Sequence, residues 1–189
     1  WVFPEDVEKK DNQYFQISTG QKVIEGPIES MSKSKKNVID PESIISRYGA
    51  DSARWFMLSD SPPEKDIKWS ESGINGAWKI CQKIWNLIIQ NREYLSMNAA
   101  SQDIVFEGNA LSLMKLVHQN LKSVTESIEK FQMNVAIAKV FELVNAISKF
   151  EIVKKDDKHA VAQSLKILIR IIEPIVPHLA EECWELTNN

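Results

Sequence analysis

The chain has 189 residues, of which 43% are hydrophobic and 26% are charged, and its formal net charge is −3. This is the composition of a folded chain of one or two domains, which excludes disorder over most of the length. No apolar stretch reaches the roughly 18 residues that a membrane-spanning helix needs. The two cysteines, Cys81 and Cys183, lie far apart without CxxC spacing. A reducing, cytosolic compartment is therefore expected, with neither a metal site nor a disulfide.

Residues 1–30 are predicted to form strands. Apolar and polar residues alternate over Tyr14–Ser18, and the pattern resumes over Lys22–Glu25 after a turn at Thr19-Gly20-Gln21. Alternation on both sides of a turn that contains Gly is a hairpin signal. Residues 31–39 are polar, rich in lysine and without a period, which predicts a loop.

Asp40 marks the point from which the sequence predicts helices. Asp40 suits an N-cap, Pro41 the first helical position and Gly49 the residue after the helix end, so a helix is expected over residues 41–48. A second helix is expected over residues 50–59. The chain is then broken at Pro62-Pro63.

Ser70 is expected to cap a long helix that runs to about residue 96. Its apolar stripe consists of Ile74, Ala77, Trp78, Cys81, Ile84, Trp85, Ile88 and Leu95. A polar linker is expected over residues 97–108. The same apolar spacing predicts helices over residues 111–131, 134–150 and 160–172, and Pro177 is expected to begin the last one. Lys154–Lys158 are expected to form a charged turn.

The sequence thus predicts a mainly α fold, in which a short β-hairpin and loop segment precedes a bundle of four or five helices. Trp78 and Trp85 are expected in the core of this bundle, and a base-stacking surface is the alternative for them. The same is expected of Met133, Phe131, Phe141 and Phe150.

The lysine-rich loop is the strongest candidate for chemistry. It places Lys33, Lys35 and Lys36 within four residues, among the hydroxyls of Ser30, Ser32 and Ser34. Lysine ammonium groups and hydroxyl donors suit phosphate oxygens, so the loop fits either a nucleotide polyphosphate or an RNA backbone. A solvated run of charge is the alternative. The loop is not a P-loop, because no Gly-rich stretch precedes the lysines.

The wider sequence around this loop resembles the class I aminoacyl-tRNA synthetases. Met31–Pro41 (MSKSKKNVIDP) resembles their K-M-S-K-S signature, and Arg47–Phe56 looks like the helices that follow it in the Leu/Ile/Val/Met subgroup. Trp1–Val7 and Ser61–Ala77 are similar to the bacterial leucyl enzymes in particular. Pro177–Trp184 looks like the end of the anticodon-binding bundle. The first signature position is usually Lys, and here it is Ser30.

The resemblance implies a leucine–tRNA ligase activity, in which leucine and ATP form leucyl-adenylate that is then transferred to tRNA(Leu). It implies that Ser30, Met31, Ser32, Lys33 and Ser34 form the ATP loop, with Lys33 as the catalytic contact to the phosphates. Mg²⁺ is expected to accompany ATP, and no metal is expected to be held by these residues. A cytoplasmic monomer without a membrane contact is expected.

In terms of this resemblance, residues 1–62 are the C-terminal end of the catalytic domain with its loop at residues 30–34, and residues 63–189 are the anticodon-binding-like bundle. The second family signature, H-x-G-H, does not occur around His118, His159 or His178. The chain begins with Trp1 and has no signal-peptide pattern. We therefore expect a piece of a longer protein that is inactive by itself.

The long helix also offers a candidate RNA face. Asn75, Lys79, Gln82, Lys83, Asn86 and Gln90 lie opposite its apolar stripe. The resemblance favours Lys79 and Lys83 as tRNA contacts, and an ordinary solvated face is the alternative. For Arg54, contact with RNA and an ion pair with Asp51 both stay open.

Three other interpretations of the whole chain remain open. A sister synthetase for isoleucine, valine or methionine would share most of these motifs. A stand-alone RNA-binding module derived from a synthetase would keep the bundle without the chemistry. A purely structural bundle would use the lysine loop only as solvated surface.

Overall fold

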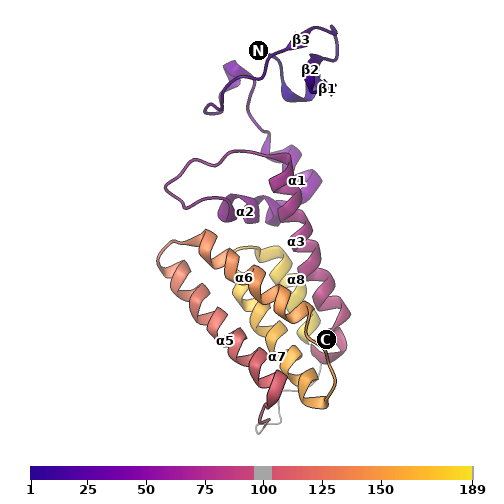
Figure 1. Cartoon of the computed structure of the whole chain (residues 1–189), viewed down its shortest axis with the longest axis vertical. Coiled ribbons are helices and arrows are strands. Elements are labelled where there is room, and N and C mark those ends of the chain that lie inside the picture. The colour runs from indigo at the N-terminus through magenta and orange to yellow at the C-terminus, as the bar shows by residue number, and fades with distance from the viewer. Residues whose placement is uncertain (96–103, 189) are drawn as a thin grey trace. The chain divides into compact units, whose positions relative to one another are not determined.

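The computed structural model describes residues 1–95 and 104–188 and is mainly helical, as predicted (Figure 1). It divides into two compact units, Trp1–Arg47 and Tyr48–Asn189. The predicted boundary at residue 62 concerns a different division, between a catalytic part and a bundle, and stays a prediction.

The N-terminal unit contains a three-stranded antiparallel sheet in the order β1-β2-β3. Its strands are β1 (Val7–Lys10), β2 (Gln13–Gln16) and β3 (Lys22–Val23). The predicted hairpin is confirmed as the pair β2–β3, with Gly20 at a φ of 66° in its turn. A second hairpin joins β1 to β2 through Asp11 and Asn12, whose φ values are 47° and 61°. Asp and Asn tolerate this left-handed conformation better than other residues with a side chain, which explains the tight turn.

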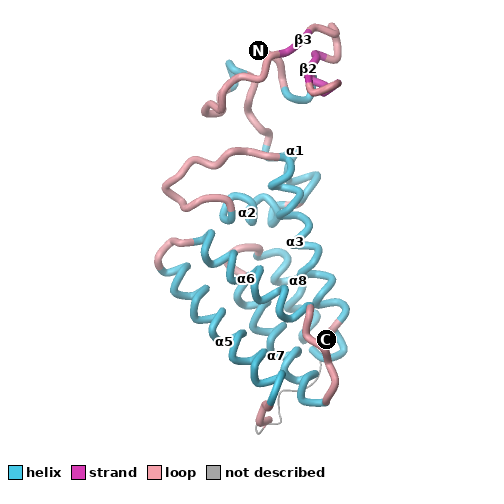
Figure 2. The backbone as a smooth tube through the Cα atoms, in the orientation of Figure 1, coloured by secondary structure: helices cyan, strands magenta, loops and turns pink. Residues whose placement is uncertain are grey.

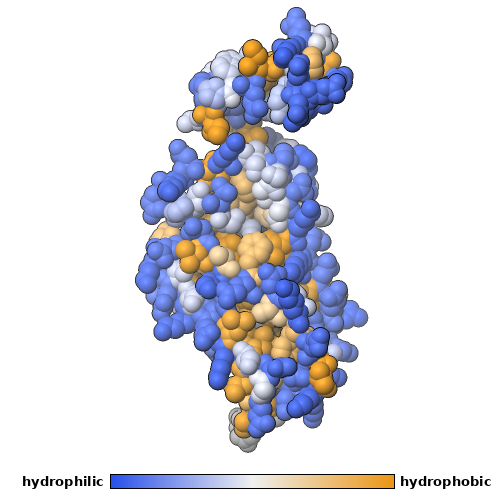
Figure 3. Space-filling model, in the orientation of Figure 1, coloured by the Kyte–Doolittle hydropathy of each residue, from blue (hydrophilic) through white to orange (hydrophobic). Residues whose placement is uncertain are grey.

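This small sheet has no core of its own. Among residues 1–43, all of which the structure describes, none is buried. Trp1, Ile24 and Ile28 are 73%, 86% and 75% exposed, and apolar atoms of the unit reach the surface (Figure 3). Because isolated small sheets need a packed apolar face to be stable, the local hydrogen bonds of this unit hold it only weakly.

Two short helices follow with the bounds that the sequence predicts, α1 (Pro41–Tyr48) and α2 (Ala50–Ser59). The Asp40 carboxylate accepts hydrogen bonds from the backbone N–H groups of Glu42 and Ser43, as expected of an N-cap. Gly49 lies between the helices with a φ of 82°, a conformation that favours glycine.

The long helix α3 (Glu71–Gln90) begins where predicted, because the Ser70 hydroxyl accepts a hydrogen bond from the Gly73 N–H at 3.1 Å. Its expected end near residue 96 is wrong. The side-chain amide of Asn91 donates to the Leu87 carbonyl at 2.7 Å, and the chain leaves helical geometry at Asn91. A separate short helix, α4 (Arg92–Leu95), follows.

The bundle is completed by α5 (Gly108–Glu129), α6 (Met133–Ser148), α7 (Lys155–Ile172) and α8 (Pro177–Asn188), which run side by side in Figure 2. α5 packs against α6 and α7, α7 packs against α4 and α8, and α2 contacts both α3 and α6. The largest fully buried side chains include Trp55, Ile74, Ile84, Ile88, Leu143, Leu165, Leu168 and Ile172. Burying one such aliphatic side chain contributes about 1.5–3 kcal/mol, so this interior dominates the stability.

The expected charged turn at Lys154–Lys158 is also wrong, because α7 begins at Lys155. The Asp157 carboxylate accepts hydrogen bonds from the backbone N–H groups of Lys154 and Val153, at 2.7 and 2.9 Å. These bonds hold the pKa of Asp157 below its usual range and stabilise the helix start.

Several aromatic side chains that we expected in the core reach the surface. Trp78 is 39% exposed, Phe131 is 69% exposed and Phe141 is 38% exposed, whereas Trp55 is buried and meets the edge of Phe141. Trp85, Met133 and Phe150 are half-buried. The expected linker at residues 97–108 lies largely outside the described residues, and residues 104–107 have no regular structure.

Candidate functional site

The predicted ATP loop contains a short 3-10 turn, Lys33–Lys35, within an otherwise irregular segment. The Ser32 hydroxyl caps this turn by accepting a hydrogen bond from the Lys35 N–H at 3.3 Å. Lys36 ends the turn in the left-handed conformation, with a φ of 53°. Ser32 therefore stabilises the conformation of the loop. The hydroxyl oxygens of Ser32 and Ser34 lie 3.1 Å apart.

Asn37 closes the loop, a role that we did not predict. Its side-chain oxygen accepts a hydrogen bond from the Ser32 N–H at 2.7 Å, and its amide donates to the Ser30 carbonyl at 3.3 Å. The signal in the sequence was the residue type itself, since Asn side chains often replace backbone groups in turns. Asn37 thereby fixes the conformation of the signature residues between Ser30 and Ser34.

The three lysines of the loop have different surroundings. The Lys35 ammonium forms an ion pair with Glu29, and the Lys36 ammonium lies 4.9 Å from the centre of the Phe3 ring. Lys33 is exposed, and its side chain has no hydrogen bond or ion pair within the described part of the chain. Of the three ammonium groups, that of Lys33 is the one without a partner in the described part of the chain.

A pocket of about 660 Å³ lies in the N-terminal unit beside this loop. Lys35, Lys36 and Asn37 line it, together with residues of the sheet and of the segment after it, but Lys33 does not. Glu29 and Glu25 also line the pocket. The pocket is therefore of mixed charge, and Lys33 is placed outside it.

Lys79 and Lys83 lie one turn apart on α3, and both are exposed. The Lys83 ammonium donates a hydrogen bond to the side-chain oxygen of Asn145 on α6, at 2.7 Å. All six residues of the predicted polar face are exposed, in agreement with a solvated face. The loop and α3 belong to different compact units.

Arg54 does not form the ion pair with Asp51 that was considered from sequence, and its contact with RNA stays a prediction. Its guanidinium donates to the carbonyl oxygens of Ile175 and Pro174, at 3.0 and 2.9 Å, where α7 ends. Asp51 instead bonds with His178 and with the backbone N–H of Leu179. Both side chains therefore hold the bundle together.

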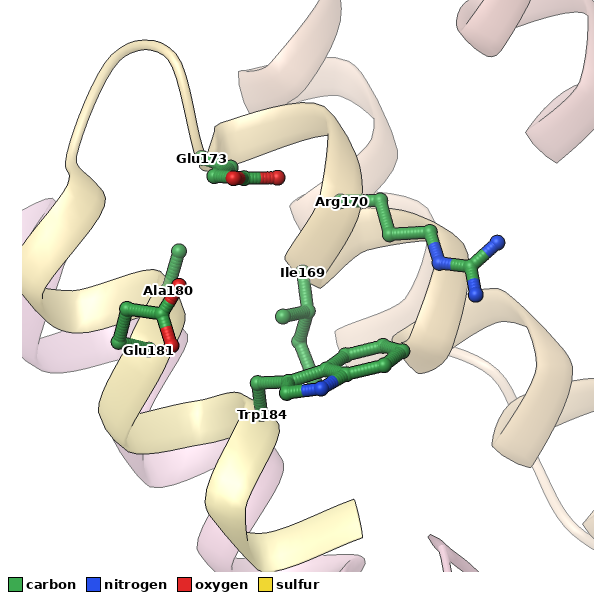
Figure 4. A pocket seen from close by; sticks show the side chains of 6 residues that line it. All are labelled: Ile169, Arg170, Glu173, Ala180, Glu181 and Trp184. Atoms are coloured by element: carbon green, nitrogen blue, oxygen red, sulfur yellow. The ribbon is translucent and has the colours of Figure 1, made fainter. Parts of the chain in front are cut away.

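A second pocket, of about 280 Å³, lies between α7 and α8 (Figure 4). The Arg170 guanidinium stacks 5.1 Å from the centre of the Trp184 ring, and the carboxylates of Glu173 and Glu181 line the same pocket. Two carboxylates disfavour a phosphate here. None of the predicted site residues lines this pocket.

No cluster of three or more His, Cys, Asp or Glu side chains suited to a metal occurs in residues 1–95 and 104–188. His118 and His178 are exposed and His159 is half-buried. No helix in these ranges is both long enough and apolar enough to cross a membrane.

Two family models match the chain. Residues 9–70 match the class I tRNA synthetases of the I, L, M and V group, and residues 111–189 match the anticodon-binding domain of tRNA ligases.

Among curated proteins, the chain is similar to bacterial leucine–tRNA ligases. It is 46% identical to that of Parvibaculum lavamentivorans over 169 residues, which is 89% of this chain and 19% of the relative. It is 44% identical to that of Agrobacterium fabrum over 199 aligned residues, which is 100% of this chain and 22% of the relative. The chain thus spans about a fifth of the length of these relatives.

Two solved structures of tRNA synthetases resemble the fold of this chain. The chain resembles the ternary complex of Agrobacterium radiobacter K84 agnB2 LeuRS-tRNA-LeuAMS with a TM-score of 0.76 and 26% identity, over 84% of this chain and 21% of that one. Methionyl-tRNA synthetase of Mycobacterium tuberculosis in complex with methionyl-adenylate shares the fold alone, with a TM-score of 0.65 and 19% identity, over 82% of this chain and 35% of that one. The chain thus matches the class I tRNA synthetases of the I, L, M and V group over residues 9–70 and the anticodon-binding domain of tRNA ligases over residues 111–189, and nearly all of it aligns with one region of bacterial leucine–tRNA ligases.

Proposed function

We propose that this chain is the part of a leucyl-tRNA synthetase that supplies a phosphate-contacting loop and a tRNA-binding bundle. The complete enzyme would activate leucine with ATP to leucyl-adenylate and transfer the leucyl group to tRNA(Leu). The similarity to leucine–tRNA ligases over nearly the whole chain supports this proposal. By itself the chain would be inactive, since no H-x-G-H motif occurs in its sequence.

Lys33 carries the chemical part of the proposal, because its ammonium has no partner among the described residues while Lys35 and Lys36 are engaged. In the activation step the leucine carboxylate attacks the α-phosphorus of ATP. The bond from that phosphorus to the bridging oxygen breaks, and pyrophosphate leaves with the negative charge. A lysine that contacts this charge more closely in the transition state than in the ground state accelerates the step.

The loop that holds Lys33 is partly ordered before ATP arrives. Ser32 and Asn37 fix its backbone, so part of the entropy cost of placing the ammonium is already met in folding. Ser30, Met31 and Ser34 are exposed beside it and complete the proposed ATP loop. Mg²⁺ would enter with ATP as part of the substrate.

Lys79 and Lys83 are the proposed tRNA contacts of the bundle. They are exposed on the polar face of α3 and would meet phosphates of the RNA backbone. Because the whole chain has a net charge of −3, its own binding to tRNA would be weak and would weaken further with salt. We further propose that the enzyme is cytoplasmic and monomeric.

The test is ATP–pyrophosphate exchange by the complete synthetase with leucine, isoleucine, valine and methionine. We expect exchange with leucine alone, and a loss of roughly 100- to 1,000-fold in rate for Lys33→Ala, as for other preorganised charge-stabilising donors. Lys35→Ala is the matched control, since Lys35 already pairs with Glu29, and its rate should fall much less.

Three outcomes would contradict parts of this proposal. Exchange with another amino acid would assign the chain to a sister synthetase. An unchanged rate for Lys33→Ala would remove the role of the loop. A folded enzyme without any exchange would favour a stand-alone RNA-binding module.

A further inference from the structure

Trp78 on α3 is a large aromatic side chain that the fold leaves 39% exposed. Its neighbours on the buried side of the same helix, Ile74, Ala77 and Cys81, are enclosed by the bundle. Trp78 therefore lies at the edge of the stripe, on the side that faces solvent. Part of the indole is thus open to solvent, while its backbone is held by a long, packed helix.

The exposed neighbours of Trp78 along its own helix are polar and include no acidic residue within one turn. Gln82 lies one turn after it, Asn75 lies one turn before it, and Lys79 is adjacent on the same exposed face. Side chains three or four positions apart on a helix lie about 5–6 Å from one another at their Cβ atoms. The indole is thus within reach of the amide groups of Asn75 and Gln82, while Lys79 points about 100° further around the helix.

The charge along this helix is unusual for the chain. No Asp or Glu occurs between Ser72 and Arg92, although the chain has 26 acidic residues among 189. The charged residues in that interval are Lys79, Lys83 and Arg92. A face with lysines and amides but no carboxylates is complementary to a polyanion.

We propose that Trp78 is a stacking contact for tRNA, with an unpaired nucleobase or a ribose lying against the indole while Lys79 contacts a neighbouring phosphate. This inference rests on the proposed function and assigns an additional residue to its RNA-binding face. Nucleobases stack on exposed aromatic side chains without regard to sequence, and lysines beside them follow the backbone. The combination suits recognition of RNA by shape.

Two other aromatic side chains of the bundle, Phe131 and Trp184, lack this combination. Phe131, at the turn between α5 and α6, is 69% exposed but follows Glu129 and Lys130, whose charges oppose one another. Trp184 is covered by Arg170, and Glu173 and Glu181 lie in the same pocket (Figure 4). These residues provide matched controls.

The experiment measures filter binding of a tRNA(Leu) transcript to the complete synthetase at several salt concentrations. We expect Trp78→Ala to weaken binding about 5- to 100-fold, as for loss of one base–aromatic stack, with the salt dependence unchanged. Lys79→Ala should instead lower the slope of log affinity against log salt by about 0.9, as for one lost phosphate contact. Trp78→Tyr should restore most of the affinity, and Phe131→Ala should bind like the wild type.

The outcomes separate this inference from the proposed function. If Lys79→Ala and Lys83→Ala weaken binding but Trp78→Ala does not, the stacking contact is wrong and the tRNA-binding bundle stands. If Trp78→Ala leaves RNA binding unchanged but destabilises the complete synthetase, the indole contacts another protein domain and the inference is overturned. ATP–pyrophosphate exchange by the complete enzyme should be unchanged in Trp78→Ala, since activation precedes the use of tRNA.

Discussion

The Asp51 carboxylate on α2 accepts a hydrogen bond of 2.6 Å from the backbone N–H of Leu179, in the first turn of α8. The same carboxylate lies 2.9 Å from Nδ1 of His178. One turn later on α2, Arg54 donates to the carbonyl groups of Pro174 and Ile175, in the turn between α7 and α8. The Asp51 carboxylate thus meets the positive end of the α8 dipole, while Arg54 satisfies carbonyl groups of the turn before α8. α2 holds both sides of the turn between α7 and α8.

Removal of the Asp51 carboxylate is expected to destabilise the bundle. Asp51→Ala leaves the Leu179 N–H without its acceptor, and loss of such a helix-end cap costs about 1–2 kcal/mol. The free energy of unfolding from urea titration measures this loss. Asp60→Ala, an exposed acid at the other end of α2, should change it by no more than about 0.5 kcal/mol. Equal effects of both substitutions would show that Asp51 is not a cap.

Two glycines of α3 should respond to alanine in opposite ways. A Cβ on Gly73 would lie 2.5 Å from Cε2 of Phe56, a buried ring that packs against Trp69 at 5.2 Å between ring centres. A Cβ on Gly76 would meet nothing within 4 Å. Because the Phe56 ring is enclosed, Gly73→Ala should cost about 1–3 kcal/mol.

Gly76→Ala should instead stabilise the protein by about 0.5–1 kcal/mol, since alanine restricts the unfolded chain and favours helix. Thermal unfolding of the two variants provides the comparison. A stabilising effect at Gly73 would mean that Phe56 moves aside without cost.

Local signals in the sequence predicted the starts of helices well, because a cap needs only its own neighbours. Asp40 and Ser70 each bond to backbone groups two or three positions ahead, which any chain segment can do before it packs. The α3 end was missed, since the Asn91 side chain competes with the backbone for the Leu87 carbonyl. Asp157 likewise caps α7 from inside a run of charge that looked like a turn.

Which side of a helix is buried was harder to predict than where the helix begins. Periodicity placed Trp78 on an apolar stripe, but which edge of a stripe is covered depends on where the neighbouring helices lie. The same limit applied to the loop. The sequence predicted a loop over residues 31–39. It did not predict the ion pair of Lys35 with Glu29 or the contact of Lys36 with the Phe3 ring, because both depend on how the N-terminal unit folds.

Hydrogen exchange should distinguish the two compact units. The sheet β1–β3 lies in a segment without buried residues, whereas α7 has many, among them Leu165 and Leu168. Amides open with free energies that follow local burial, up to the global stability. We therefore expect amides of β2 to exchange orders of magnitude faster than those of α7 in the isolated chain. Equal protection would require that the sheet be stabilised by contacts beyond its own residues.

Alkaline pH should destabilise the fold through its two thiols. Burial raises the pKa of Cys81 to about 11 and that of Cys183 to about 12, from an ordinary value of 9.0. Between pH 9 and 11 the unfolded chain loses thiol protons that the folded chain keeps, so the free energy of unfolding falls as pH rises. Each thiol contributes at most about 1.4 kcal/mol per pH unit to this fall.

The comparison that isolates this effect is the wild type against the variant with both Cys81→Ala and Cys183→Ala, each unfolded in urea at pH 7.5 and at pH 10. The variant starts from a lower stability, because two buried side chains are shortened. Its loss of stability between the two pH values should nevertheless be smaller than that of the wild type, since all other titratable groups are common to both proteins. An identical loss would mean that the folded protein releases its thiol protons as readily as the unfolded chain does.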